Sequence, residues 1–146
     1  MRYKPIRELV STESGQVIRD LKPVWLMSPL SVSDTLPLST DNFDVVIFDE
    51  ASQIPLEDAI PAIYRSKRLV VVGDAKQMPP SQFFSTSTET VSLLDQSSYN
   101  LNSELLTWHY RSEHPRLIEF SNHNFYDNEL SYFPPNKDLN PIDHIH

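Results

Sequence analysis

The stretch Val45-Val46-Ile47-Phe48-Asp49-Glu50-Ala51-Ser52-Gln53 decides the fold, because an apolar run ends in two consecutive carboxylates. The run from residue 43 to 48 is rich in valine and isoleucine without polar alternation, which is typical of a strand covered on both faces of a parallel sheet. Open α/β sheets bind ligands at the carboxyl ends of such strands. The stretch therefore predicts an α/β fold with Asp49 and Glu50 at its ligand-binding edge.

Two interpretations of this acidic pair stay open on the residues alone. In the first, Asp49 helps to hold Mg²⁺ and Glu50 polarises an attacking water. In the second, the pair is the N-cap and the first-turn acid of a helix that begins directly after the strand.

A second apolar run, residues 69–72, completes a βαβ unit with the first. The intervening segment has Pro55 near its start, acidic residues in its first turn and basic residues, including Arg65, at its end. A connection of about 20 residues is long enough for a crossover helix and keeps both strands in one sheet.

The polar stretch Gly73-Asp74-Ala75-Lys76-Gln77-Met78-Pro79-Pro80 follows the second run. A glycine at this point lets the backbone approach a ligand, and a glutamine side chain both donates and accepts hydrogen bonds. The double proline stiffens the exit. Taken alone, the stretch is more typical of a polar turn that stops at proline.

The other segments predict smaller elements. Residues 1–22 suit one or two short amphipathic helices interrupted near Gly15, and residues 24–27 suit a buried strand. Residues 81–103 predict a surface excursion with one helical turn, and residues 105–108 predict a strand. Pro115 opens a predicted helix through Tyr126, and the proline-rich C-terminal end predicts irregular structure.

The composition excludes several classes of protein. A chain of 146 residues holds one domain, or one and a fragment. It has no cysteine, which excludes disulfides and thiolate metal sites, and its net charge of −8 argues against a protein that wraps nucleic acid through counterion release. No apolar run approaches the roughly 20 residues that span a bilayer, and no secretory signal begins the chain. We expect a cytoplasmic protein without a membrane partner.

Other groups of residues give weaker indications of chemistry. The spacing of His109, His114 and His123 matches no standard metal-ligand pattern. No G-x-S-x-G elbow or catalytic cysteine indicates a covalent hydrolase. A set of aromatic residues at helical spacing is expected in the core, with a base-stacking platform as the alternative: Phe120, Phe125, Tyr126, Tyr132 and Phe133.

Three stretches, in order over residues 43–130, resemble motifs of the superfamily 1 helicases. Residues 49–53 resemble motif II (Walker B), and residues 73–80 resemble motif III. The third is His109-Tyr110-Arg111-Ser112-Glu113-His114-Pro115, which with residues 120–126 resembles motif IV and the helix after it. The branch is similar to the 5′-to-3′ translocating helicases typified by the nonsense-mediated-decay factor, which place a segment resembling Ser28-Pro29-Leu30-Ser31-Val32 just upstream of motif II.

This resemblance implies an ATP site and a role for each matched residue. Asp49 would coordinate the Mg²⁺ of the nucleotide through water, and Glu50 would orient the hydrolytic water. Gln77 would sense the γ-phosphate, with Asp74 among the nucleotide-binding residues. Arg111 would reach from a second motor lobe as an arginine finger; its alternative is an ordinary surface ion pair. Ser28, Pro79 and Pro80 would lie near the single-stranded DNA or RNA.

The chain contains no G-x-x-x-x-G-K-[ST] phosphate-binding loop, since Gly15 is followed by Gln16-Val17-Ile18 and Gly73 belongs to the second motif. The resemblance therefore implies an incomplete P-loop (RecA-like) parallel sheet with flanking helices. Residues 1–103 would be the C-terminal portion of a first RecA-like lobe, and residues 104–146 the beginning of a second. We expect a fragment of an ATP-dependent helicase that is inactive alone, ATP and Mg²⁺ being cofactors of the complete parent.

Two alternatives remain. The chain could be a free-standing, non-catalytic binding module derived from a helicase, or a complete ATPase with an unorthodox nucleotide site. In each case a sheet that lacks its central strand exposes edges. We therefore also expect a second chain or self-association to complete the sheet.

Overall fold

The computed structural model of the chain describes residues 4–12, 14–38, 42–80, 91–110 and 115–132. The chain forms two compact units, Met1–Leu101 and Asn102–His146. Helices and small parallel sheets give an α/β architecture, as predicted. Within the described ranges, no helix is long and apolar enough to cross a membrane.

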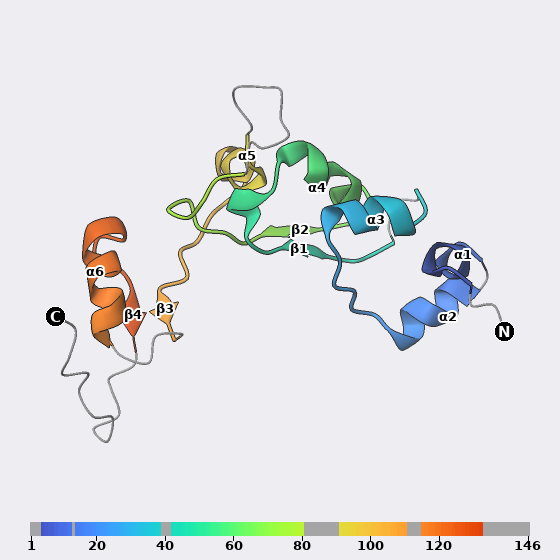
Figure 1. Ribbon diagram of the computed structural model, residues 1–146, viewed down its shortest axis with the longest axis horizontal. Coiled ribbons are helices and arrows are strands. Elements are labelled where there is room, and N and C mark those ends of the chain that lie inside the picture. The colour runs from blue at the N-terminus through green and yellow to red at the C-terminus, as the bar shows by residue number, and fades with distance from the viewer. Residues whose placement is uncertain (1–3, 13, 39–41, 81–90, 111–114, 133–146) are drawn as a thin grey trace, which may run out of the picture. The chain divides into compact units, whose positions relative to one another are not determined.

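The predicted βαβ unit is confirmed in the first unit. Strands β1 (Val46–Phe48) and β2 (Leu69–Val71) pair in parallel, with Phe48 opposite Val71. Helix α4 (Leu56–Ile63) connects them and packs along the sheet (Figure 1). Pro55 precedes the helix, and Glu57 and Asp58 lie in its first turn, where negative charge favours a helix start.

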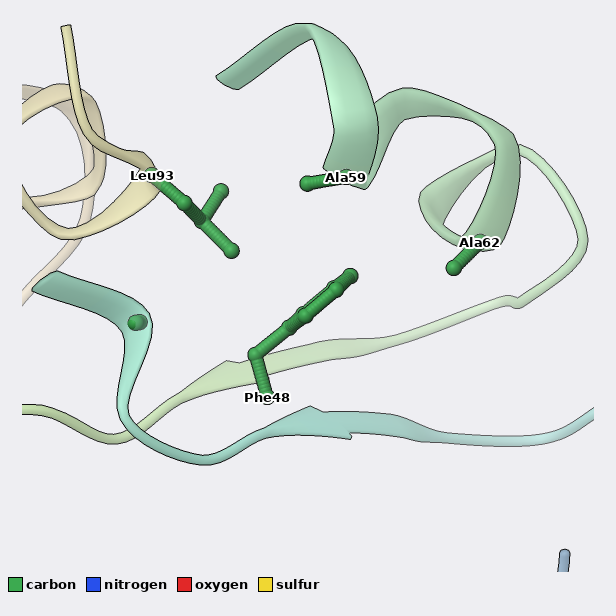
Figure 2. Close-up of a cluster of buried hydrophobic side chains, with 5 residues drawn as sticks. Phe48, Ala59, Ala62 and Leu93 are labelled. Carbon is green, nitrogen blue, oxygen red and sulfur yellow. The ribbon is translucent and has the colours of Figure 1, made fainter. Parts of the chain in front are cut away.

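The core of this unit lies on one face of the sheet. Phe48 points from β1 toward Ala59 and Ala62 of α4, and the small alanine side chains leave room for its ring (Figure 2). Leu93, only 1% exposed, enters the same space from the start of helix α5 (Leu93–Asn100). Ala51, which is fully buried at the start of the 3₁₀ turn η1 (Ala51–Gln53), completes the cluster, so the core is shared by β1, η1, α4 and α5.

The prediction of a surface excursion with one helical turn over residues 81–103 is wrong for the described part of that range. Helix α5 has eight residues, and Ser92 caps it by accepting a hydrogen bond from the nitrogen of Asp95 at 3.0 Å. Leu93 donates its main-chain N–H to the carbonyl oxygen of Ile54 at 2.8 Å. These contacts anchor the polar segment to the loop before α4.

The prediction that both faces of the strands are covered is also wrong for the described residues. Ile47 is 66% exposed, and Val45, Val70 and Val72 are also exposed. Successive side chains of a strand point to opposite faces, so these residues alternate with the half-buried or buried Val46, Phe48, Leu69 and Val71. One apolar face of the sheet therefore meets solvent in this structure.

The N-terminal segment forms two short helices, as predicted: α1 (Ile6–Val10) and α2 (Ser14–Leu21). The interruption near Gly15 is also confirmed, since α1 ends at Val10 and α2 begins at Ser14, so that Gly15 lies in the first turn of α2. Gly15 packs so closely on the main chain of Val10 that a Cβ would collide with the Val10 carbonyl group. The glycine thus permits the close approach of the two helices.

The prediction of a buried strand at residues 24–27 is wrong. Val24 and Leu26 are 79% and 95% exposed, and no described strand pairs with this segment. Trp25 is half-buried because its ring meets Phe43 edge to face at a centroid distance of 6.1 Å. An apolar run alone does not supply the neighbouring strand that burial requires.

Helix α3 (Pro29–Thr35) packs against α4, and Arg65 joins the ends of both helices. Arg65 is only 4% exposed, and its guanidinium donates to the carbonyl oxygens of Leu36, Pro37 and Pro61 at 3.2, 3.1 and 2.6 Å. A buried charge needs such hydrogen bonds, because it has lost its water.

The second unit contains α6 (Pro115–Phe125) and the parallel pair β3 (Trp108–His109) and β4 (Ser131–Tyr132). The predicted helix is confirmed. The predicted strand at 105–108 is shifted toward the C-terminus, and Leu105 and Leu106 are exposed. The predicted irregular C-terminal end lies outside the described residues.

The turn after α6 is held by a buried asparagine. The Asn122 side chain donates to the carbonyl oxygen of Leu130 at 2.9 Å and accepts from the Leu130 nitrogen at 3.0 Å. Phe120 and Phe125 contact each other edge to face at 6.4 Å, but both are exposed, so the expectation that they are core is wrong. Tyr132 is also exposed, Tyr126 is half-buried, and Phe133 lies outside the described residues.

Candidate functional site

The loops that follow β1 and β2 leave the sheet at the same edge, because the two strands are parallel neighbours. The nitrogen of Val72 donates to the carbonyl oxygen of Phe48 at 2.8 Å, and the nitrogen of Ala51 donates to the carbonyl oxygen of Val72 at 3.0 Å. The ladder thus continues beyond the strands. It brings the loop of Asp49 and Glu50 against the loop that begins at Gly73.

Gly73 lies where these loops pack closely against each other. A Cβ at this position would lie 3.1 Å from the nitrogen of Ala51, 3.2 Å from that of Ser52 and 3.1 Å from a methyl carbon of Leu94. The sequence predicted a glycine that lets the backbone approach a ligand. In the structure it lets one loop approach the other.

Glu50 has a backbone conformation that is uncommon for a residue with a side chain. Its φ and ψ are 54° and 39°, in the left-handed region. The nitrogen of Glu50 donates to Oδ1 of Asp49 at 3.0 Å, and Nε2 of Gln53 lies 3.5 Å from Oε2 of Glu50. Residues held in such conformations cost stability and cluster at functional sites.

The alternative interpretation of the acidic pair as a helix cap fails because no capping hydrogen bond from the N-cap side chain is present. A 3₁₀ turn, η1 (Ala51–Gln53), does follow Glu50, which occupies its N-cap position. The side chain of Glu50 makes no capping hydrogen bond there, and Oδ1 of Asp49 accepts from its immediate neighbour instead. Both carboxylates are exposed at the edge of the sheet.

The carboxylates of Asp49 and Glu50 suit a hard divalent cation. Among the described residues, the ion pairs are Lys4–Glu8 and Lys67–Asp44, so no described cation neutralises either carboxylate of the edge. Carboxylate oxygens with water completing the shell are the ligands that Mg²⁺ prefers. The donor set therefore fits Mg²⁺, with Asp49 as the residue that would hold it.

Asp74 and Gln77 lie together in a tight turn. Oδ1 of Asp74 accepts from the nitrogen of Lys76 at 2.9 Å, and Oδ2 accepts from Nε2 of Gln77 at 3.0 Å. The carbonyl oxygen of Asp74 accepts from the nitrogen of Gln77 at 3.1 Å. The polar turn that the sequence offered as an alternative is therefore present, and it fixes the Gln77 side chain.

The remaining residues predicted for the site are Ser28, Pro79, Pro80 and Arg111. The hydroxyl of Ser28 caps α3, since it accepts from the nitrogen of Ser31 at 3.2 Å. Pro79 is exposed, but Pro80 is buried, which leaves only the first proline open to a nucleic-acid strand. Arg111 lies outside the described residues.

Sequence reasoning missed one polar residue beside the edge. Ser52 is buried, and its hydroxyl oxygen has no hydrogen-bond partner among the described residues. Buried polar groups are nearly always paired, so this hydroxyl is an exception. A serine between Ala51 and Gln53 gives no signal of burial in the sequence.

Histidine does not complete a metal site among the described residues, where no group of three metal-ligating side chains gathers. Nδ1 of His123 lies 3.5 Å from the side-chain nitrogen of Asn128, at the turn after α6. His114 lies outside the described residues. The candidate site is therefore the sheet edge formed by residues 49–53 and 73–77.

Comparison with known proteins gives the family. Residues 26–84, which include this whole edge, match the model of an AAA domain. The chain is 34% identical over 135 residues to the uncharacterized ATP-dependent helicase MG140 of Mycoplasma genitalium, covering 80% of this chain. It is 35% identical over 103 residues to the helicase sen1 of Schizosaccharomyces pombe, covering 66% of this chain.

A further relative is the DNA replication ATP-dependent helicase/nuclease DNA2 of Gallus gallus, 28% identical over 132 residues that cover 84% of this chain. The matched region spans 12%, 6% and 13% of the lengths of these three relatives. All three are named as helicases, and the family model ends just beyond the second loop of the site. The chain belongs to the superfamily 1 helicases.

Proposed function

We propose that this chain supplies part of the Mg²⁺-ATP hydrolysis site of an ATP-dependent helicase that moves along single-stranded DNA or RNA. The observation that carries the proposal is the close packing of the two loops at Gly73, where a Cβ would lie 3.1 Å from the nitrogen of Ala51 and 3.2 Å from that of Ser52. This packing sets two carboxylates, which no cation of the described residues neutralises, on a loop next to the one that carries the hydrogen-bonded Gln77. Phosphoryl transfer needs both kinds of group close together: carboxylates that hold the metal and orient the water, and a polar side chain that contacts the phosphate.

Each residue has a proposed role at this edge. Asp49 would hold the metal through water, and Glu50 would orient the water that attacks the γ-phosphate. Gln77 contacts the γ-phosphate, Asp74 supports the nucleotide side of the same loop, and Arg111 stabilises charge on the transferring group. A bound Mg²⁺ would neutralise charge on the phosphates.

The proposal assigns the chain to two motor lobes. Residues 1–103 correspond to the C-terminal portion of a first RecA-like lobe, and residues 104–146 to the beginning of a second. The division of the structure at Leu101 and Asn102 is close to this boundary. No phosphate-binding loop occurs in the sequence, so the backbone donors that hold the β- and γ-phosphates must come from elsewhere. We therefore propose that the chain alone hydrolyses no ATP.

The loop of residues 73–80 also suggests how hydrolysis is coupled to movement. Gln77 is fixed to Asp74 at one end of the loop, and the exposed Pro79 and buried Pro80 stand at the other. Loss of the γ-phosphate would release the contact of Gln77 and allow the proline turn to shift against the nucleic-acid strand. Replacing Gln77 with alanine in the full-length protein should lower the unwinding per ATP hydrolysed. Unchanged unwinding per ATP would contradict this coupling.

The experiment that tests the proposal compares hydrolysis by the full-length protein with nucleotide binding by the chain. Glu50→Gln should reduce the single-strand-stimulated kcat by roughly 10²-fold or more, because its amide cannot polarise the attacking water. Asp58→Asn removes one carboxylate from the exposed start of α4 and serves as the control with unchanged kcat.

Two results would overturn the proposal. One is full activity of the Glu50→Gln protein. The other is micromolar binding of Mg²⁺-ATP by the chain alone, which would mean that its own residues form a complete nucleotide site. Nucleic-acid binding that neither ATP nor Glu50→Gln alters would instead support a non-catalytic binding module.

A further inference from the structure

The turn after β2 contains a carboxylate whose two oxygens have different partners. Oδ1 of Asp74 accepts from the main-chain nitrogen of Lys76, and Oδ2 accepts from the side-chain Nε2 of Gln77. The first bond at 2.9 Å shapes the turn, and the second at 3.0 Å restrains a side chain. One residue therefore fixes both the loop and the group that the loop presents.

The chemistry of Asp74 determines how the amide of Gln77 is oriented. The oxygen and nitrogen of a glutamine amide are hard to tell apart by shape, so orientation is usually assigned from hydrogen bonds. A carboxylate only accepts hydrogen bonds. Gln77 must therefore offer its NH₂ group to Asp74, which leaves its carbonyl oxygen and one N–H for a partner outside the loop.

Fixing this side chain before a ligand arrives has a kinetic consequence. Gln77 is exposed, and a free glutamine side chain loses rotational freedom when it binds. The bond to Asp74 restricts that freedom in advance. An amide already aimed at the reacting group is worth most in the transition state, where small errors of position are costly.

We infer that Asp74 is a positioning residue, which acts through Gln77 and is not itself a ligand of the nucleotide. This inference rests on the proposed function, in which Gln77 contacts the γ-phosphate. It differs from the sequence-based expectation that Asp74 binds the nucleotide directly. Both oxygens of its carboxylate already accept hydrogen bonds from the loop.

Asp74→Asn separates positioning from loop folding. The nitrogen of Lys76 needs an acceptor, so the amide oxygen of the new side chain keeps that bond and the turn is preserved. Its NH₂ group then faces Gln77, which must turn over and accept through its carbonyl oxygen. The loop stays folded while the group presented outward is reversed.

The test measures single-strand-stimulated ATP hydrolysis by the full-length protein carrying Asp74→Asn, Gln77→Ala or both changes. Each single variant should lower kcat by roughly 10²-fold with KM changed less than about two-fold. The double variant should be no slower than either single one, because both changes remove the same interaction. Asp58→Asn, which removes an equal charge from the start of α4, should match the wild type.

A spectrum of the ¹⁵N-labelled chain checks the structural premise. Asp74→Asn should shift the side-chain NH₂ signals of Gln77 and leave the main-chain signal of Lys76 in place, whereas Asp58→Asn should shift neither. Unmoved Gln77 signals would overturn the inference, as would a wild-type kcat for Asp74→Asn alongside a slow Gln77→Ala protein. A wild-type protein without ATPase activity would instead overturn the proposed function, and the inference with it.

Discussion

The main-chain nitrogen of Ala51, three residues beyond the end of β1, donates a hydrogen bond at 3.0 Å to the carbonyl oxygen of Val72, one residue beyond the end of β2. This bond ties the loop of the acidic pair to the loop of the fixed glutamine. The two loops therefore share one backbone support, and a change at their contact should affect both of them.

Gly73→Ala tests that contact. The new methyl group would meet the nitrogen of Ala51 and a methyl carbon of Leu94, each at 3.1 Å. Backbone atoms do not move aside easily, so we expect the free energy of unfolding to fall by about 1–3 kcal/mol in urea titrations of the chain. The methyl group would also lie 3.2 Å from the nitrogen of Ser52. Adding Leu94→Ala relieves only one of these three contacts, so the free-energy cost of Leu94→Ala should combine non-additively with that of Gly73→Ala. A Gly73→Ala chain as stable as the wild type would mean that the loops separate freely.

Glu50→Gly tests the cost of the left-handed conformation. Glycine adopts a φ of 54° without a Cβ clash, although it loses more backbone freedom on folding. The two effects leave an expected gain of about 0.5–1 kcal/mol in the free energy of unfolding. Glu50→Gln keeps the strained backbone and should leave stability unchanged. If glycine destabilised the chain, the conformation would not be a source of strain.

Ser52→Ala should stabilise the chain, because it removes a buried hydroxyl that has no partner among the described residues. The expected gain in the free energy of unfolding is about 1 kcal/mol. Ser98→Ala on α5, where the hydroxyl is exposed, is the matched control and should change it by less than about 0.5 kcal/mol. A loss of stability for Ser52→Ala would show that its hydroxyl is hydrogen-bonded in solution.

Leu93→Ala should destabilise the chain by about 2–5 kcal/mol, because it empties the core between β1, α4 and α5. Tyr99 lies on the same helix and is 86% exposed, so Tyr99→Ala should cost less than about 0.5 kcal/mol. Chemical unfolding of the two variants gives the comparison. Equal effects would mean that α5 does not pack on the sheet.

The open sheet face predicts self-association of the chain. Ile47, Val70 and neighbouring side chains expose apolar surface, so thermal unfolding midpoints should rise with chain concentration. Ile47→Lys should weaken this dependence, whereas Leu26→Lys, which lies outside the sheet, should not. A sharp melt that is independent of concentration, with a monomeric mass in sedimentation, would contradict the prediction.

The parts of the fold that the sequence predicts depend on local patterns. Two valine-rich runs joined by a helix of suitable length specify the βαβ unit, and Asp49 follows directly from the end of the first run. The parallel pairing then places both loops at one edge. Any sequence with those runs and that connection would suggest the same arrangement.

The parts that the sequence does not predict depend on contacts between distant residues. Leu93 is one of the few apolar residues of a polar segment, which makes it a candidate anchor, but the sequence does not indicate that it packs against Phe48 and α4. Leu26 lies in an apolar run but has no described partner strand, so it is exposed. The left-handed backbone of Glu50 is equally invisible, because glutamate has no preference for that conformation.

Arg65 is expected from the sequence as a basic residue at the end of a helix, and in the structure it also connects that helix to α3. The three carbonyl oxygens that accept from its guanidinium carry no formal charge. They belong to peptide groups at the end of α3 and within α4. A lysine has one charged nitrogen and could not span the three sites with the same planar geometry. Arg65 therefore adds a hydrogen-bonded link to the direct packing of α3 on α4, so that a displacement of one helix is transmitted to the other.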